Sequence, residues 1–253
     1  MLCTLTTDFG TIDTYVAQMK ATIIKYCPQV KFVDLTHHIS QGNIMQTQFE
    51  LEQSIYLFPP NTVHLVVVDP TVGSSRHPII VKWKDSYLVG PDNGIFTSFL
   101  ENGSSCHIID KGINPFASKT FHGRDIFAPA CGELLNGKSL EEIAPEILET
   151  PIKIPLPTAS IKGSTLTGIV WKIDHFGNVI TSIRKSDLEI VDITAIRINY
   201  KHFTDNLVGT FPDVPAGKEL AYTGSAGFLE LAVNSGNCSE LWEINPGDPV
   251  EII

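Results

Sequence analysis

The sequence predicts two domains: an α/β domain with a central, mostly parallel sheet flanked by helices, and then a smaller all-β, barrel-like domain. Strand and helix patterns alternate in the first half, a proline-rich segment follows, and short β-rich runs separated by Gly, Asn and Asp fill the rest. The predicted boundaries are 1–153 for the first domain, 154–163 for the linker and 164–253 for the second. With 253 residues, 43% of them hydrophobic and 18% charged, the chain can bury a core in each domain.

The first domain opens with a strand and a helix. Residues 2–6 form an apolar run that ends in a Thr-Asp-Phe-Gly turn. From Ile12 onward, Val16, Met19 and Ile23 recur at the spacing of one helix face. The same criteria predict strands at 30–35, 63–69, 79–83 and 87–89, and helices at 44–55 and 125–135.

The run 63–69 is almost continuously apolar, which is typical of a strand covered on both faces. After it, residues 151–163 contain three prolines and small polar residues, as expected of a linker. The β-rich runs of the second domain show little helical periodicity and predict a compact barrel or sandwich. They span residues 166–173, 179–183, 193–198, 228–233 and 249–252.

Composition argues against several classes of partner. The formal net charge is −10 and the chain has no long Lys/Arg run, so we expect no nucleic-acid and no membrane partner. The first residues lack a basic segment followed by an apolar one, and no apolar stretch approaches the roughly 20 residues that span a bilayer. The five cysteines are scattered without a CxxC pair, which predicts reduced thiols and a cytoplasmic location.

Several predicted strands end in an acidic turn. Because ligands bind beyond the carboxyl ends of strands in open α/β sheets, carboxylates gathered there could bind ribose hydroxyls, an ammonium group or a metal. The alternative is that Asp, Asn and Gly are simply common in turns. The acidic residues in question are Asp8, Asp34, Asp69, Asp92 and Asp174.

A metal site is not expected. Asp34, His37 and His38 are close in sequence, but adjacent residues of a strand point to opposite faces and cannot share one ion. The chain also lacks HxH and HxxxH pairs, as well as the GxGxxG, P-loop and GxSxG motifs. We therefore predict neither a metal nor a cofactor.

Seven motifs together resemble the S-adenosyl-L-methionine (SAM) hydrolases, or SAM hydroxide adenosyltransferases, the sister family of the fluorinase and chlorinase. The resemblance covers essentially the whole chain, and the order and spacing of the motifs make it specific. The motifs are TDFG, DLTHHI, VVVDPTVGSSR, VGPDNGIF, TFHGRD, DHFGN and TGSAGFLELAVNSGN.

The resemblance implies hydrolysis of SAM to adenosine and methionine by attack of an activated water at C5′. Asp69, Arg76 and His122 match the residues associated with water activation. Asp8 is similar to the carboxylate that binds the ribose hydroxyls, and Asp13 to the acid that binds the methionine ammonium. Whether Asp69 or His122 takes the proton from water stays open.

The resemblance also implies a homotrimer, with each active site between the first domain of one subunit and the second domain of its neighbour. In the second domain, Asp174 and Asn178 would contact the methionine or ribose part, and Phe176 would pack on the adenosyl group. The adenine and methionine ends would be lined by Ser225, Glu230, Val233 and Asn234.

Three alternatives remain at this stage. A SAM-dependent halogenase resembles the same pattern, but the halogenases carry an aromatic residue at the position of Asp69 and a Tyr-Ser pair in place of His122-Gly123. A non-catalytic adenosine- or SAM-binding module would have lost the catalytic residues, which this chain retains. A metallohydrolase using acidic residues would lose activity on chelation. One departure from the hydrolases is Thr71, where they often have glycine.

Overall fold

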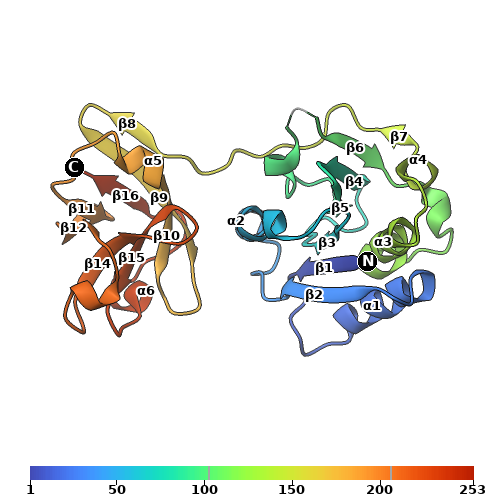
Figure 1. The fold of residues 1–253 in the computed structure, drawn as a ribbon, viewed down its shortest axis with the longest axis horizontal. Coiled ribbons are helices and arrows are strands. Elements are labelled where there is room, and N and C mark those ends of the chain that lie inside the picture. The colour runs from blue at the N-terminus through green and yellow to red at the C-terminus, as the bar shows by residue number, and fades with distance from the viewer. Residues whose placement is uncertain (102, 206) are drawn as a thin grey trace. The chain divides into compact units, whose positions relative to one another are not determined.

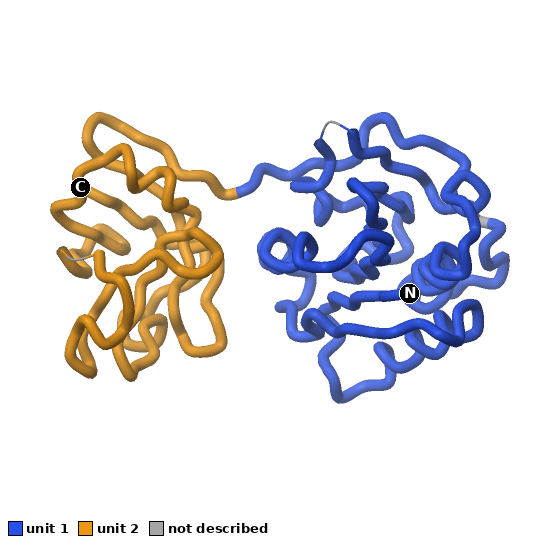
Figure 2. The backbone as a smooth tube through the Cα atoms, viewed as in Figure 1, with its two compact units in different colours: residues 1–156 blue, residues 157–253 orange. Residues whose placement is uncertain are grey.

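The computed structural model describes residues 1–101, 103–205 and 207–253. It divides into two compact units, Met1–Leu156 and Pro157–Ile253 (Figure 2). Each unit buries hydrophobic clusters of its own. We therefore describe the units separately.

Unit 1 is built on a seven-stranded sheet within the described residues (Figure 1). Its strands are β1 (Leu2–Thr7), β2 (Lys31–Thr36), β3 (Val63–Val67), β4 (Pro78–Trp83), β5 (Ser86–Pro91), β6 (Ser105–Ile108) and β7 (Glu146–Ile147). They lie in the order β2-β1-β3-β5-β4-β6-β7.

The sheet is parallel only in its first half. The pairs β1–β2, β1–β3 and β3–β5 are parallel, whereas β4–β5, β4–β6 and β6–β7 are antiparallel. A short turn that includes Lys84, at φ +51°, joins β4 to β5. So short a connection cannot hold the crossover that a parallel pair needs. The predicted mostly parallel sheet therefore describes the half made of β2, β1, β3 and β5.

The helices of unit 1 differ from the prediction at two of their beginnings. The first helix starts at Tyr15 rather than Ile12, and Ile12 is 97% exposed. The predicted helix 125–135 consists of a π-helical turn, Gly123–Phe127, followed by a helix from Ala128. The helices are α1 (Tyr15–Tyr26), α2 (Ile44–Ser54), α3 (Ala128–Leu135) and α4 (Leu140–Ile143).

Both faces of strand β3 are covered, as its composition predicts. All five of its residues are buried. Leu65 and Val67 belong to the hydrophobic cluster that includes residues of α1 and α3, whereas Val66 belongs to the cluster that includes residues of α2.

The strand order fixes where a ligand can bind in unit 1. Helix α1 follows β1 and leads to β2, and α2 leads from β2 to β3, which lies on the other side of β1. The connections thus reverse direction between β1 and β3, and such a switch point leaves a crevice beyond the carboxyl ends of the strands. Asp8 follows β1, and Asp69 comes shortly after β3.

Unit 2 contains a curled nine-stranded sheet within the described residues. Its strands are β8 (Ser160–Lys162), β9 (Thr165–Ile173), β10 (Val179–Arg184), β11 (Ile196–Ile198), β12 (Lys201–Thr204), β13 (Leu207–Val208), β14 (Glu219–Thr223), β15 (Phe228–Val233) and β16 (Pro249–Ile252). The short helices are α5 (Lys185–Leu188) and α6 (Cys238–Leu241).

The pairings of unit 2 run as an open path from β12 to β13, with β8 added beside β9. Closure into a barrel therefore stays a prediction. Strand β8 lies inside the predicted linker 154–163, because residues 160–162 pair antiparallel with residues 165–167 of β9 across a tight turn.

All five cysteines are buried with free thiols. In the part of the chain that the structure describes, no helix combines the length and apolar character needed to cross a membrane.

Candidate active site

A cavity of about 610 Å³ opens in unit 1 at the carboxyl ends of β1 and β3. It lies at the switch point of the sheet. Its lining comes from four segments: the turn after β1 with the start of α1, the loop before α2, the segment from the end of β3 onward, and the residues that lead into the π-helical turn. The lining residues are Asp8, Phe9, Tyr15, Gln41, Gly42, Val67, Asp69, Pro70, Val72, Thr120, Phe121, His122 and Gly123.

Asp69, Arg76 and His122 form one hydrogen-bonded group at this cavity. The guanidinium of Arg76 binds Asp69 through two nitrogens: Nε donates to Oδ1 at 3.1 Å, and Nη2 donates to Oδ2. Nη2 also lies 2.8 Å from Nδ1 of His122. The side chains of Asp69 and Arg76 are only 6% and 5% exposed, so the ion pair is shielded from water. Arg76 contacts both partners without lining the cavity itself.

The bond to Arg76 determines the protonation state of His122. Arginine has no acceptor, so Nδ1 of His122 must accept the bond, which leaves the ring proton on Nε2. The pKa of His122 is lowered from its ordinary value by burial and by the positive charge of Arg76, against the opposing effects of Asp69 and Asp125. Both observations indicate a neutral imidazole.

Close packing at Gly123 places His122. A Cβ atom on Gly123 would lie 2.9 Å from Sδ of Met19 and 3.3 Å from Val67. A side chain at this position would crowd Met19 of α1 and Val67 of β3, so glycine suits the close approach of the π-helical turn. His122 therefore reaches the end of β3, where Asp69 follows.

The turn after β5 supports the segment after β3 instead of adding a second carboxylate to the cavity. Nδ2 of Asn93 donates to the carbonyl of Val68 at 2.9 Å. The neighbouring Asp92 is buried, and its Oδ1 accepts the backbone N–H of Ile152 at 2.8 Å. Burial raises the pKa of Asp92. Of the five acidic residues predicted to gather at one site, Asp8 and Asp69 line the cavity of unit 1.

Asp8 lines the cavity, and Asp13 does not. Oδ2 of Asp8 accepts the backbone N–H of Gly42 at 2.9 Å, which orients the carboxylate. Asp13 is exposed, in the bend that precedes α1.

Three aromatic residues of the lining were missed in the sequence. Phe9, Tyr15 and Phe121 contact one another with ring centroids 5.3–6.0 Å apart. Phe9 and Phe121 stand directly beside Asp8 and His122 in the motifs TDFG and TFHGRD, and that adjacency is the signal that could have found them. These three rings form an apolar part of the cavity lining, which we call the aromatic wall. Asp8 and Asp69 make another part of the lining negatively charged.

The histidine pair lies just after β2 rather than on a strand, and its two members have different environments. His37 is buried, with Nδ1 2.9 Å from the hydroxyl of Thr7 and Nε2 3.1 Å from Asp34, whereas His38 is exposed. Lys20 also binds Asp34, at 2.7 Å. This network supports the strand end before Asp8.

Unit 2 has a separate cavity of about 630 Å³. It brings together four of the predicted binding residues: Asp174, Phe176, Asn178 and Val233. Sequence reasoning missed the other residues that line it, which are Phe211, Ser235, Gly236 and Asn237. Two of these, Ser235 and Gly236, directly follow the predicted Asn234.

The DHFGN turn shapes this second cavity. Oδ1 of Asp174 accepts the backbone N–H groups of Phe176 and Asn178, both at 2.8 Å, and its Oδ2 accepts Nδ2 of Asn178 at 3.0 Å. Gly177 adopts φ +85°, and a Cβ atom there would overlap the side chain of Asn237. The turn therefore holds Phe176 at the surface, 71% exposed, as a ring that a ligand can cover.

The remaining predicted binding residues do not line either cavity. Ser225 is exposed. Glu230 accepts the hydroxyl of Tyr222 at 2.5 Å, and burial raises the pKa of Glu230. Nδ2 of Asn234 donates to the carbonyls of Phe211 and Val214, so this amide secures a loop.

The fold and the site define a two-domain protein whose α/β unit carries a buried carboxylate–arginine–histidine group at a switch-point cavity. Residues 3–144 match the SAM hydroxide adenosyltransferase N-terminal domain, and residues 168–251 match the corresponding C-terminal domain. The chain belongs to the SAM hydroxide adenosyltransferase family.

Three similar proteins illustrate the relationship. An (R)-S-adenosyl-L-methionine hydrolase of Methanocaldococcus jannaschii is 36% identical, over 100% of this chain and 95% of its own length. The crystal structure of an uncharacterized conserved protein from Thermotoga maritima is 36% identical, with a TM-score of 0.91 over 100% of this chain and 99% of that one. A fluorinase of an Actinoplanes species is more distant, at 26% identity over 97% of this chain and 95% of its own length.

Proposed function

We propose that this chain hydrolyses SAM to adenosine and methionine by attack of water at C5′ of the ribose. The observation that carries the proposal is the buried Asp69–Arg76–His122 group, two of whose members line the cavity beside Asp8. Methionine leaves as a neutral thioether and needs no acid. Positioning of the two reactants can supply about 7–11 kcal/mol of the barrier.

Arg76 cannot by itself keep a hydroxide in the cavity at neutral pH. A lone positive charge about 4 Å away, at an effective dielectric near 20, would stabilise hydroxide by about 4 kcal/mol, or about three pKa units. Free water is so weak an acid that its pKa, lowered by this amount, would still lie far above neutrality. The carboxylate of Asp69 offsets even this effect, since it binds the same guanidinium. The mechanism therefore needs a base.

Asp69 is the base that the hydrogen bonds favour. Nδ1 of His122 accepts from Arg76 and Nε2 carries the ring proton, so the resting imidazole has no free lone pair for a water proton. The carboxylate of Asp69 keeps acceptor capacity beyond its bonds to Arg76. In this mechanism Asp69 takes the proton as the C–O bond forms, His122 orients the water through Nε2–H, and Arg76 holds both in place.

Each cavity supplies contacts for part of the substrate. In unit 1, the carboxylate of Asp8 binds the ribose 2′- and 3′-hydroxyls, and the rings of Tyr15 and Phe121 attract the sulfonium. In unit 2, Phe176 and Val233 pack on the adenosyl group, and Asn178 provides a polar contact. We further propose a homotrimer in which unit 1 of one subunit and unit 2 of its neighbour complete each site.

The preferred substrate is the (R) epimer at the sulfonium. Support comes from the hydrolase of Methanocaldococcus jannaschii, whose name specifies that epimer. The two epimers exchange the places of substituents on sulfur, so an asymmetric wall of aromatic rings and carboxylates can bind them differently. Separate assays of each purified epimer should give a higher kcat/KM for (R)-SAM.

Halogenation does not suit this cavity. A halide nucleophile would have to stand close to the carboxylate of Asp69, whose negative charge repels it. Asp69 lines the cavity with its side chain only 6% exposed, so little water screens this repulsion. We therefore expect no 5′-halo-adenosine when chloride or fluoride is added.

The decisive experiment is incubation of the pure protein with SAM in H₂¹⁸O, followed by mass spectrometry. Label in adenosine would show attack of water at C5′. Release of methylthioadenosine or homocysteine would refute the proposal, and loss of activity on prolonged chelation would indicate a metallohydrolase instead.

A further inference from the structure

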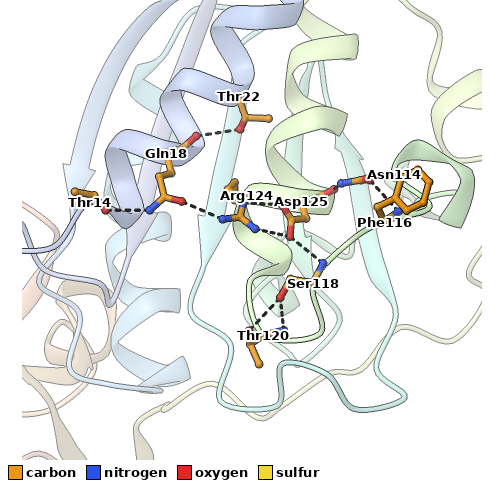
Figure 3. Close-up of polar contacts among 9 residues, drawn as sticks. All are labelled: Thr14, Gln18, Thr22, Asn114, Phe116, Ser118, Thr120, Arg124 and Asp125. Carbon is orange, nitrogen blue, oxygen red and sulfur yellow. Dashed lines mark hydrogen bonds and ion pairs between the residues drawn. The ribbon is translucent and has the colours of Figure 1, made fainter.

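The π-helical turn Gly123–Phe127 carries two charged residues that the proposed chemistry does not use (Figure 3). The guanidinium of Arg124 binds Asp125 in a bidentate pair, with Nε donating to Oδ1 at 2.6 Å and Nη2 to Oδ2 at 2.9 Å. His122 directly precedes this turn. The geometry of the turn therefore decides the place of His122.

A side-chain relay connects the turn to helix α1 (Figure 3). Nη1 of Arg124 donates to Oε1 of Gln18 at 3.0 Å, and Nε2 of Gln18 donates to the hydroxyl of Thr14 at 2.9 Å. Thr14 precedes Tyr15, the first residue of α1 and part of the cavity lining. One guanidinium thus links two sides of the cavity.

Asp125 fixes the loop that leads into His122. Its Oδ2 accepts the backbone N–H of Ser118 at 2.9 Å, and its carbonyl accepts Nδ2 of Asn114 at 3.2 Å. Lys119 follows Ser118 in the same loop. Its carbonyl oxygen lies 2.8 Å from the position of a Cβ on Gly73, and Gly73 belongs to the loop that leads to Arg76. The loops carrying His122 and Arg76 therefore meet on the backbone that Asp125 holds.

Arg124 also supports the aromatic wall. Its guanidinium lies over the ring of Phe121, 5.0 Å from the centroid, and Phe121 contacts Tyr15 edge to face at 5.3 Å. The Arg124 side chain is 37% exposed, so its ion pair adds little to global stability. A bidentate, stacked guanidinium instead provides fixed geometry, which lysine cannot reproduce.

We propose that Arg124 and Asp125 are positioning residues, which hold His122 and Phe121 in register with α1 and with the loop of Arg76. The inference rests on the proposed hydrolysis of SAM. Neither residue lines the cavity, so their effect on the reaction passes through His122 and the aromatic wall.

The main test is Arg124→Lys, which keeps the charge and loses the three-way geometry. A displacement of reacting groups by about 1 Å can lower the rate about 100-fold, so we expect kcat to fall by about 10- to 100-fold. KM should change much less than kcat, because Asp8, the proposed contact for the ribose hydroxyls, keeps its bond to the backbone of Gly42. Lys138→Ala is the control, since Lys138 forms an exposed ion pair with Glu133, away from the cavity.

Gln18 offers a rescue test that leaves the Arg124–Asp125 pair intact. Gln18→Ala removes the link to α1 and should lower kcat several-fold. Gln18→Glu keeps an acceptor for Nη1 of Arg124, and the Thr14 hydroxyl can donate to the new carboxylate, so this variant should retain most of the wild-type kcat. A purely structural role for the relay would move the thermal midpoint and leave kcat unchanged.

Asp125→Asn supplies an independent readout in the pH profile. The charged groups facing His122 are Asp69, Arg76 and Asp125, and the negative charge of Asp125 raises the pKa of His122. Without that charge His122 stays neutral to lower pH, so the acidic limb of the kcat profile should move to lower pH.

The outcomes separate this inference from the proposed function. If the wild-type protein releases no adenosine from SAM, the proposed function fails. If wild type is active while Arg124→Lys and Gln18→Ala keep wild-type kcat, or raise only KM, the positioning role is overturned. The same conclusion follows if Gln18→Glu loses as much kcat as Gln18→Ala.

Discussion

At the scale of single residues, Arg76 makes several contacts that hold the site together. It donates to both oxygens of Asp69 and to Nδ1 of His122, and its guanidinium lies over the ring of Phe127, 5.2 Å from the centroid. Its Nη1 is buried and has no acceptor within residues 1–101, 103–205 and 207–253.

Replacing Arg76 tests this arrangement. Arg76→Lys retains a positive charge but cannot serve Asp69 and His122 together, so kcat should fall by about 10²-fold, as for the loss of one oriented donor in other enzymes. KM should change much less than kcat. Steady-state kinetics would show it, with Arg197→Lys as an exposed control in β11. Unchanged turnover would remove Arg76 from the mechanism.

His64 makes a second prediction at this scale, for stability. It is fully buried in β3 with Nδ1 2.8 Å from the Thr4 hydroxyl, and burial lowers its pKa from 6.5 to about 4. Between these two pH values the unfolded chain binds a proton that the folded protein does not, so stability is complete above pH 6.5 and falls as the pH drops. The loss by pH 4 should approach about 3 kcal/mol.

Denaturant unfolding at pH 7 and pH 4.5 checks this dependence. His64→Gln removes the titrating group and should lose clearly less stability between the two pH values than wild type. His38→Gln, at an exposed histidine, serves as the control and should behave as wild type. Parallel curves for His64→Gln and wild type would contradict the assignment.

At the scale of elements, the site depends on loops that pack backbone against backbone. Gly73 adopts φ +82° in the loop before Arg76, and a Cβ there would lie 2.8 Å from the carbonyl of Lys119. Gly137 adopts φ +91° after α3 with open space around it. The two glycines share a left-handed backbone and differ in crowding, so they form a matched pair.

Alanine at each glycine separates the two effects. Gly137→Ala should cost about 1–2 kcal/mol, from the left-handed backbone alone. Gly73→Ala should cost more and should also lower kcat, because it pushes the loop of Arg76 away from the segment of His122. Thermal unfolding and kinetics measure both. Equal losses of stability with unchanged kcat would show that the close approach is unimportant.

At the scale of the whole molecule, the predicted contacts for SAM are divided between two units with separate cores and cavities. The proposed trimer would join them across subunits. Asp69→Asn disables a residue of unit 1, and Asn178→Ala disables one of unit 2. Each variant alone should be nearly inactive.

Co-expression of the two variants tests the shared site. Random trimers would pair an intact unit 1 with an intact unit 2 in about a quarter of their sites, so about a quarter of wild-type activity should return. Light scattering should report three subunits. If the site lies within one chain, every site carries a defect and no activity returns.

Local patterns in the sequence were sufficient for much of the fold. The apolar run of β3, the helix face of Val16, Met19 and Ile23, and the β-rich second half all depend on neighbouring residues, whose periodicity the sequence displays directly. The antiparallel half of the first sheet was missed because a short apolar run predicts a strand but not whether it runs parallel or antiparallel to its neighbour. Strand β8 was missed because its partner had to be known.

The order of the sequence motifs was enough to indicate the family, which the two matching domains confirm. The same motifs predict Asp69, Arg76 and His122 as catalytic residues, and this assignment stays a prediction. The three-dimensional contacts show that these three residues touch, that Asp92 accepts a backbone N–H instead, and that Nδ1 of His122 is occupied. The reason is physical: contacts between residues far apart in the chain follow from strand order and close packing at glycines, and neither is a local property. The direction of a hydrogen bond is even harder to predict from sequence, because it depends on the positions of both partners.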